Sequence, residues 1–330
     1  MKRFAGLMMV VFLFVAALPT YAQVVNCYDL SADDCAIVTN STVATASLTG
    51  LSVDFEADVA ITGLALVGML SEDEAPEDIF INVTGNGDID LSQATPAFAF
   101  NFVMTNATAG ETVALGVSIV DGALYLDTPE GVVGVNLDAA TLAELGLPAD
   151  FLSNSPSTFG DLMALDDSMP VDVDSADLSA IEPYITFARE ADNAAGDSVF
   201  VFHLNITGLL NSPEINEVFG ALGAQLGDDP EIAQVMMLLP MFLSMVESEV
   251  AMAQAINADG YVTNFNTNFY LGADFGAFFA PDAGLDPIEI NALVNVDMSN
   301  FDTPNAIVAP ADAVFLTAEQ VQEILGAFAP

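Results

Sequence analysis

A single histidine is present in the sequence, so acid-base or nucleophilic chemistry would have to rest on it. His203 lies in a stretch where apolar and polar residues alternate, and no serine or cysteine completes a catalytic set with it. We expect it to be a strand residue with an ordinary hydrogen-bond partner. The sequence therefore favours a protein that is not an enzyme, because a hydrolase would have to work with carboxylates alone and no pair is indicated by spacing.

Two cysteines, Cys27 and Cys35, are close enough in sequence to form a small disulfide loop. Metal binding is the alternative, but two thiols and one histidine cannot complete a tetrahedral zinc site. The acidic residues in 86–90 and 172–177 resemble parts of a calcium loop but lack the remaining ligand spacing and the closing glutamate. We expect a disulfide, no metal site and no cofactor.

The charge balance excludes nucleic acid as a partner. The chain has 47 acidic and 3 basic residues, and Arg189 is the one basic residue beyond the N-terminal Lys2 and Arg3. Nothing is available to neutralise phosphates, and an anionic membrane surface would repel the chain. Because 53% of the residues are hydrophobic, the chain can still bury a large core.

The N-terminus has the pattern of a secretory signal peptide. Three residues with two positive charges precede the apolar run 4–18, and small residues lead to Ala22. We expect cleavage near Ala22 and secretion; an uncleaved anchor is the alternative, although the run is short for a membrane span. Residues 24–26 lack the pattern of a lipoprotein processing site, which argues against a lipid anchor on Cys27.

Alternating hydrophobicity predicts the elements that would position any binding site. In residues 97–137, apolar side chains recur at every second position from Phe98 to Met104 and from Val113 to Ile119, and a hairpin is expected at 121–122. Further strands are expected at 53–61, 79–91, 198–206, 261–271 and 288–296. We expect a sheet assembled from both ends of the chain. The predicted organisation is a signal peptide at 1–22, an N-terminal segment with a helix at 23–50, and one domain at 51–330.

Two helices matter for this interpretation. Ser31 is a predicted N-cap for a helix that ends near Ala46. A second helix is expected from residue 230 to 256, rich in methionine, without charge from 232 to 246, and bent at Pro240. This helix could be packed on the sheet as part of the core, or it could form the wall of a hydrophobic cavity.

Two segments carry a family resemblance: GVSIVDGALYLDTPEGV at 116–132 and VNVDMSNFDTPNAIVAPADA at 294–313. With the N-terminal helix and the long strands, they resemble the LppX/LprG group of exported mycobacterial-type lipoproteins, related in fold to the lipoprotein carrier LolA. The resemblance implies an α+β fold in which a curled antiparallel half-barrel has helices packed across its concave face. A hydrophobic cavity between them would carry acylated lipids. The sequence departs from the group in lacking the lipoprotein processing motif.

From these patterns we expect a carrier for lipids or other hydrophobic molecules, acting as a monomer and making transient contact with a membrane or transporter. The expected cavity residues are Phe98, Phe100, Phe102, Val117, Ile119, Met237, Met241 and Met245. The alternative is a structural or adhesive domain of the cell envelope, in which the same residues form a solid core and no ligand binds.

Overall fold

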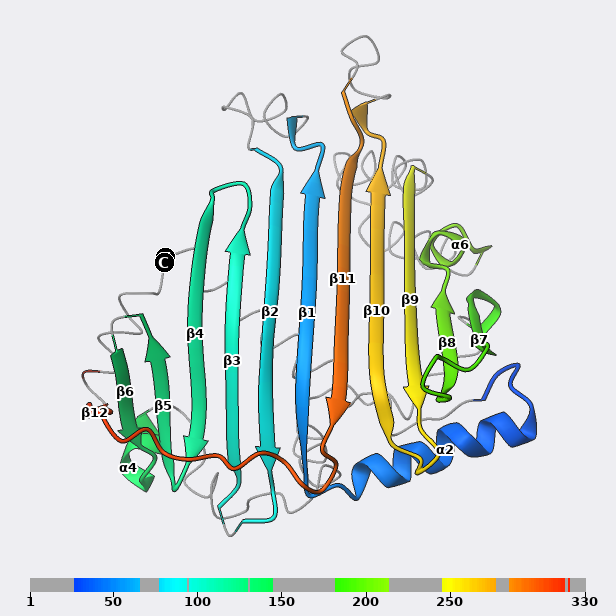
Figure 1. Cartoon of the computed structure of the whole chain (residues 1–330). Helices are drawn as coiled ribbons and strands as arrows, with labels where there is room; N and C mark the ends of the chain where they lie inside the picture. The colour runs from blue at the N-terminus through cyan, green and yellow to red at the C-terminus, as the bar shows by residue number, and fades with distance from the viewer. Residues whose placement is uncertain are drawn as a thin grey trace, which may run out of the picture.

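The computed structural model describes residues 27–65, 77–93, 95–129, 131–144, 182–213, 245–276, 285–317 and 320. A single twelve-stranded sheet dominates these residues, in the order β12-β6-β5-β4-β3-β2-β1-β11-β10-β9-β8-β7 (Figure 1). The strands are β1 (Gly50–Thr62), β2 (Ile79–Asp90), β3 (Ala97–Asn106), β4 (Glu111–Val120), β5 (Ala123–Thr128), β6 (Gly131–Asn136), β7 (Ile185–Arg189), β8 (Ser198–Leu204), β9 (Val246–Ile256), β10 (Val262–Ala273), β11 (Ile288–Ser299) and β12 (Val314–Phe315). The sheet is curled and unclosed, with β12 and β7 at its edges.

The sheet is assembled from strands of both ends of the chain, as the sequence predicted, and β1 and β11 meet in its middle. β1 pairs antiparallel with β2 on one side and with β11 on the other, for example Phe55 with Gly85 and with Val296. The short pairing between β6 and β12 is parallel, and every other pairing between the described strands is antiparallel. Strands β1 to β6 therefore form one side of the sheet and β7 to β11 the other, with the short β12 added to the edge of the first side.

Alternation gives the sheet two chemically different faces. Directly paired residues on neighbouring strands point to the same side, so the register defines each face across the whole sheet. On β1 the first face carries Leu51, Val53, Phe55 and Ala57, which are buried, and the second carries Asp54, Glu56 and Asp58, which are exposed. We call these the apolar face and the polar face.

The main core lies on the apolar face around the pairing of β1, β2, β3 and β11. Its buried members are Leu48, Leu51, Val53, Phe55, Ala57, Val83, Ile89, Leu91, Phe102 and Val296. Two glycines of β2 make this packing dense, because a Cβ added at Gly85 would overlap the ring of Phe55 and one at Gly87 the ring of Phe100. The aromatic rings thus fill the space that side chains on β2 would otherwise occupy.

A C-terminal segment, residues 300–313, runs across the strand ends from β11 toward β12 (Figure 1). It lies on the polar face: the Asp302 carboxylate accepts hydrogen bonds from the backbone and hydroxyl of Thr49, and the Asn305 amide donates to Asp88 at 3.0 Å. Its small apolar residues cover a third hydrophobic cluster, formed by Ile307, Ala309 and Ala313 with Ala97, Val120, Ala123 and Tyr125.

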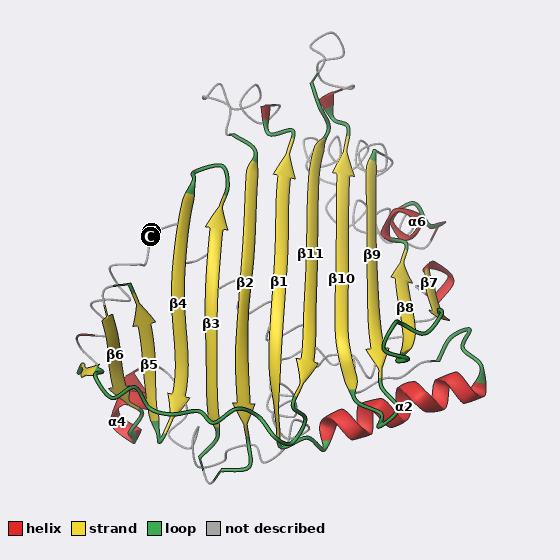
Figure 2. Ribbon diagram, in the orientation of Figure 1, coloured by secondary structure: helices red, strands yellow, loops and turns green. Residues whose placement is uncertain are grey.

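The helices of the described residues lie at the ends and edge of the sheet (Figure 2). α2 (Ala32–Ala46) begins after Ser31, whose hydroxyl accepts from the Asp34 backbone N–H, which confirms the predicted cap. α4 (Ala139–Glu144) follows β6, and α6 (Ile206–Leu210) follows β8, which ends at Leu204 and not at the expected residue 206. No helix in this part of the chain is long and apolar enough to cross a membrane.

The predicted helix from 230 to 256 is wrong over its last part, because residues 246–256 form β9. Alanine, methionine, glutamate and glutamine are good helix formers, which favoured a helix. Pairing of β9 with β8 on one side and β10 on the other outweighs that preference. Met245 therefore lies in a turn directly before β9, while Met237 and Met241 lie outside the described residues.

Candidate functional site

The predicted cavity residues on β3 and β4 share the apolar face. Phe98 lies directly opposite Ile119, and Phe100 directly opposite Val117, in neighbouring antiparallel strands. Phe102 is buried in the main core with its ring centre 5.4 Å from that of Phe55. The other four are half-buried and pack at the margin of this core or beside it. The sequence therefore placed these residues correctly on one face of the sheet. That this face binds a ligand stays a prediction.

Another part of the apolar face contains an open groove that sequence reasoning missed. It lies over β7, β8, β9 and β10, which we call the wing, and it is a shallow depression open to solvent. We call it the aromatic groove; it is lined by Phe187, Phe200, Phe202, Met252, Ala253, Gln254 and Phe265.

The register explains why these side chains meet. Phe202 on β8 pairs with Phe187 on β7 and with Met252 on β9. One row away, Gln254 on β9 lies between Phe200 on β8 and Phe265 on β10. Residues two apart in a strand point to the same side of the sheet. The side chains of the two rows therefore lie next to one another on the apolar face.

The sequence contained part of the signal for the groove. Alternation in residues 198–204 placed Phe200 and Phe202 on one side correctly. Met252 and Gln254 were assigned to a helix, and β7 was not predicted at all. Ile185 and Phe187 alternate with polar or small neighbours over only a short span, which is a weak strand signal.

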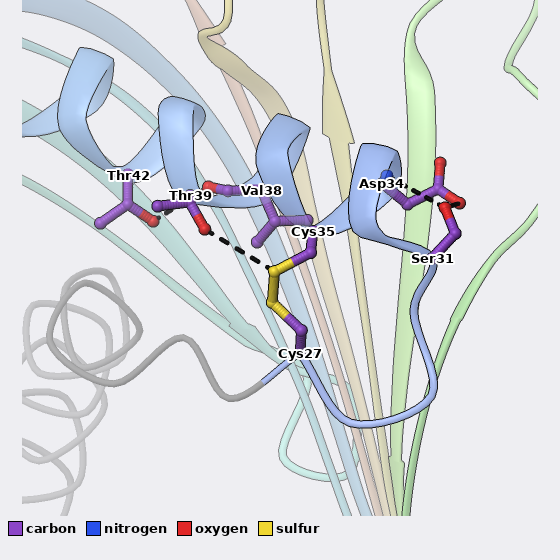
Figure 3. Close-up of a disulfide and its surroundings, with 7 residues drawn as sticks. All are labelled: Cys27, Ser31, Asp34, Cys35, Val38, Thr39 and Thr42. Atoms are coloured by element: carbon purple, nitrogen blue, oxygen red, sulfur yellow. Dashed lines mark hydrogen bonds between the residues drawn. A yellow bond between two sulfur atoms is a disulfide. The ribbon is translucent and has the colours of Figure 1, made fainter.

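Helix α2 covers the end of the wing near the groove. Val38 of α2 is buried in a cluster with Phe187, Phe200 and Ile256, and Phe200 has no exposed surface. The disulfide between Cys27 and Cys35 joins the segment before α2 to the first turn of the helix, with a Cα–Cα distance of 5.5 Å (Figure 3). This confirms the predicted disulfide and fixes the start of α2 beside the wing.

An ion pair ties α2 to the β7–β8 hairpin. Arg189 at the end of β7 contacts Asp34 of α2 and Asp192 of the hairpin, each at 2.9 Å, and its guanidinium lies 6.0 Å from the ring centre of Phe200. Hydrogen bonds from the Ser31 hydroxyl and the Arg189 guanidinium hold the pKa of the Asp34 carboxyl below its usual value. The one basic residue beyond position 3 thus stands at the edge of the aromatic groove with two carboxylates already bound.

The residues that could do acid-base or metal chemistry are placed elsewhere. His203 lies on β8 and faces the side opposite the groove, with its Nδ1 2.9 Å from the Glu249 carboxylate. Residues 86–90 lie within β2, where Asp88 accepts a hydrogen bond from Ser52. Within the described ranges no three histidine, cysteine, aspartate or glutamate side chains are grouped to hold a metal ion. The second predicted acidic segment, 172–177, lies outside those ranges.

Comparisons with known proteins add little to this picture. Scans against family models and curated proteins find no match. Among solved structures, LprF from Mycobacterium bovis is 13% identical, with 86% of this chain and 98% of that chain covered and a TM-score of 0.30. A porin-like protein from Bacteroides uniformis is 8% identical, with 77% and 98% covered and a TM-score of 0.20. A beta-barrel-like protein of unknown function from Brucella abortus is 8% identical, with 77% and 99% covered and a TM-score of 0.19. At these TM-scores the likenesses carry no argument for function.

Proposed function

We propose that this protein is an exported, non-enzymatic carrier that binds lipids or other hydrophobic molecules on the apolar face of its sheet. The observation that carries the proposal is the aromatic groove, a depression lined mostly by phenylalanine in which Phe202, Met252 and Phe265 are half-buried. Ligand sites in proteins are concave and lined mostly by apolar and aromatic side chains with a few polar groups, and the groove has this composition. Leaving such a surface in contact with water is unfavourable, and a hydrophobic ligand would relieve that cost.

The groove is smaller than a complete binding pocket. It is a shallow depression of the surface, whereas small-molecule sites are usually clefts of about 300 to 1,000 Å³. We therefore place one part of the ligand in the groove and the remainder along the apolar face toward Phe100 and Val117. In this arrangement the predicted cavity residues on β3 and β4 would contact the distal part of a long ligand.

Other features support export and carriage. A disulfide is typical of oxidising compartments outside the cytosol, in agreement with a signal peptide cleaved near Ala22. The strongly acidic polar face favours solubility of a monomer with a hydrophobic cargo on its other face. Transient contact with a membrane or a transporter would then load and unload the cargo. The acidic charge favours a carrier that leaves an anionic membrane readily.

A structural or adhesive envelope domain is the second candidate, and the dense centre of the sheet favours it. Phe55 is 9% exposed and Leu51 2%, so this part of the apolar face is packed as a solid core. If the whole face were equally solid, no ligand would bind. The distinction between the two functions therefore depends on the wing.

Binding of an uncharged, environment-sensitive dye such as Nile red tests the proposal. The wild-type protein should bind it saturably, and Phe202→Ser in the groove should weaken binding. The matched control is Phe80→Ser, because Phe80 is a strand phenylalanine on the polar face and is 43% exposed. Organic extraction of protein from its native host should also release acyl lipid. Dye uptake that does not saturate, together with no extracted lipid, would favour the structural domain.

A further inference from the structure

The C-terminal segment and β12 together form a strap, residues 300–316, that ends at the edge of the sheet opposite the wing (Figure 1). Hydrogen bonds hold its first part. The Asp302 backbone N–H donates to the Gly50 carbonyl at 2.8 Å, and the Asn305 backbone N–H donates to the Asp88 carboxylate at 3.1 Å. The strap is therefore fixed where it leaves β11.

The remaining part of the strap is held much more loosely. No hydrogen bond joins residues 306–313 to any other residue that the structure describes. Beyond them, β12 pairs with β6 over two positions, Val314 with Val133 and Phe315 with Gly134. A pairing this short contributes little stability, so the end of the strap can separate from β6 without disturbing the other strands.

The exposure of the strap agrees with a loose attachment. Val308 is 76% exposed, Val314 62% and Phe315 49%. Apolar residues that remain this exposed gain little free energy from their contacts. Local opening is expected where few apolar contacts are buried.

The surface under the strap is well packed. Its residues, which we call the floor, come from β3, β4 and β5 and are at most 6% exposed: Ala97, Val120, Ala123 and Tyr125. Each of these strands is paired with a neighbour on both sides, so the floor does not depend on the strap. Displacement of the strap would leave the floor and the outer edge of β6 open to another occupant.

Gly134 on β6 gives this surface its specific part. A Cβ added there would lie 3.2 Å from ring atoms of both Phe315 and Tyr125. The centres of these two rings are 5.8 Å apart and their planes meet at 77°, an arrangement that aromatic pairs favour. The missing side chain therefore makes room for one aromatic ring beside Tyr125.

Charge indicates how a better occupant would differ from the strap. The floor is uncharged, but the formal net charge of the chain is -44, and Asp127 is exposed on β5 two residues after Tyr125. Asp312 is the one charged residue in 306–316, and it adds a further negative charge to this surface. A segment with a basic residue at the position of Asp312 would be attracted instead.

We propose that the strap is an autoinhibitory contact and that it covers a docking site for an extended segment of a partner protein. The segment is apolar, carries an aromatic residue that lies against Gly134, and has a basic residue close by. It adds to the edge of β6 as a parallel strand, as β12 does. The inference does not depend on the proposed carrier function, because the floor lies on the polar face at the other end of the sheet from the aromatic groove.

Peptide binding to the full chain tests the proposal. The probe is a fluorescent peptide with the sequence of residues 306–317, and fluorescence anisotropy measures its affinity. In the wild-type protein the tethered strap competes with the probe at a high effective concentration. The double variant Ile307→Ser, Phe315→Ser weakens the strap and leaves the floor intact, so it should bind the probe at least about tenfold more tightly than wild type.

Three further variants are controls. Val308→Ser changes an exposed strap residue and should leave the affinity at the wild-type value. Gly134→Val, added to the double variant, fills the space for the aromatic ring and should abolish binding. A disulfide introduced by Val133→Cys with Val314→Cys, at two directly paired positions, should lock the strap and exclude the probe. Circular dichroism confirms folding, and Phe315→Ser alone replaces the double variant if the latter does not fold.

A second peptide, with lysine in place of Asp312, tests the contribution of charge. At low salt it should bind the double variant at least about threefold more tightly than the first peptide, and the difference should narrow at about 0.5 M NaCl. Equal affinities of the two peptides at low salt would overturn the preference for a basic segment.

The remaining outcomes decide whether the site exists and what it receives. No probe binding by the double variant, or binding that Gly134→Val does not reduce, would overturn the docking site. If the paired cysteine variant forms its disulfide between two copies of the chain, the surface receives the strap of a second copy, and the proposal of a partner protein is overturned. Nile red binding should be the same in the double variant as in wild type, so this result is separate from that of the carrier function.

Discussion

The centre of the sheet and its wing present similar apolar side chains on the same face, yet they pack differently. In the centre, formed by β1, β2, β3 and β11, the rings of Phe55 and Phe100 occupy the space above Gly85 and Gly87. In the wing, the apolar-face positions of β7 to β10 contain no glycine, and each ring is opposed by another side chain such as Met252. The centre is packed densely around these glycines, whereas in the wing Phe200 and Phe187 are buried and Phe202, Met252 and Phe265 stay half-buried around the aromatic groove. Glycine placement therefore distinguishes how the two regions of the apolar face pack.

The largest effect is expected from removing one ring in each region. Phe55→Ala should lower the free energy of unfolding by about 3 to 5 kcal/mol, because it creates a cavity in a dense core. Phe202→Ala should cost only about 1 to 2 kcal/mol, since one side of this ring already faces the groove. Urea unfolding followed by circular dichroism measures both. Equal losses of unfolding free energy in the two variants would mean that side chains pack as densely in the wing as in the centre.

Removal of the disulfide should loosen the wing and spare the centre. The Cys27 and Cys35 pair closes a loop with a sequence separation of 8, for which chain entropy predicts about 2.5 kcal/mol of stabilisation. In the double variant Cys27→Ser, Cys35→Ser we expect faster hydrogen exchange in α2, β7 and β8 and unchanged exchange in β1 and β2. Uniformly faster exchange would show that α2 stabilises the whole sheet and not the wing in particular.

A glycine in the centre should resist even a small substitution. Gly87→Ala should destabilise the fold by about 1 to 3 kcal/mol, because the new methyl group overlaps the Phe100 ring. In a double-mutant cycle with Phe100→Leu, part of this loss should disappear, since the smaller side chain vacates the space. If the losses of unfolding free energy in the two single variants are additive, the cost of Gly87→Ala comes from the backbone and not from overlap with the Phe100 ring.

The smallest effect concerns the ion pair that holds α2 to the wing. The pKa of Asp34 is lowered in the fold by its hydrogen bonds to Ser31 and Arg189, so the unfolded chain binds more protons as the pH falls. The contribution of Asp34 is therefore complete above the unfolded pKa, near 3.9, and is lost as the pH drops through the folded value. The difference in melting temperature between wild type and Asp34→Asn should stay constant from about pH 5 to 8 and shrink below about pH 4.

Asp33→Asn is the control for that experiment, because Asp33 lies in the same helical turn and makes no ion pair within the described ranges. Its effect on melting temperature should be smaller and should not depend on Arg189. If the melting temperature of Asp34→Asn differs from that of wild type by the same amount at pH 2 as at pH 7, the ion pair is not the cause of the difference.

Sequence reasoning recovered most of the sheet because its long strands alternate clearly. β1 to β5, β8, β10 and β11 were all predicted, and so was a sheet assembled from both ends of the chain, because strands were expected before and after the helical middle. The cap at Ser31 and the disulfide were predicted from local chemistry that does not depend on distant residues.

In the wing, β8 and β10 were predicted, but β7 and β9 were not, because their local signals are weak or misleading. β9 consists largely of helix-forming residues, and its strand conformation depends on pairing with β8 and β10, which local propensity does not contain. β7 is too short for alternation to be distinctive. The sequence placed the candidate site in the β3–β4 region and the methionine-rich segment. The structure adds the aromatic groove of the wing, which becomes evident only from the register of the strands.

The central claim is that a hydrophobic ligand occupies the wing, and a single-tryptophan quenching experiment tests it most directly. The chain contains no tryptophan, so Phe202→Trp and Phe80→Trp each introduce one reporter, on the apolar and the polar face respectively. Titration with an uncharged lipid that carries a doxyl quencher should quench the Phe202→Trp variant saturably and leave the Phe80→Trp variant nearly unchanged. Equal quenching of both variants, or none in either, would contradict the account.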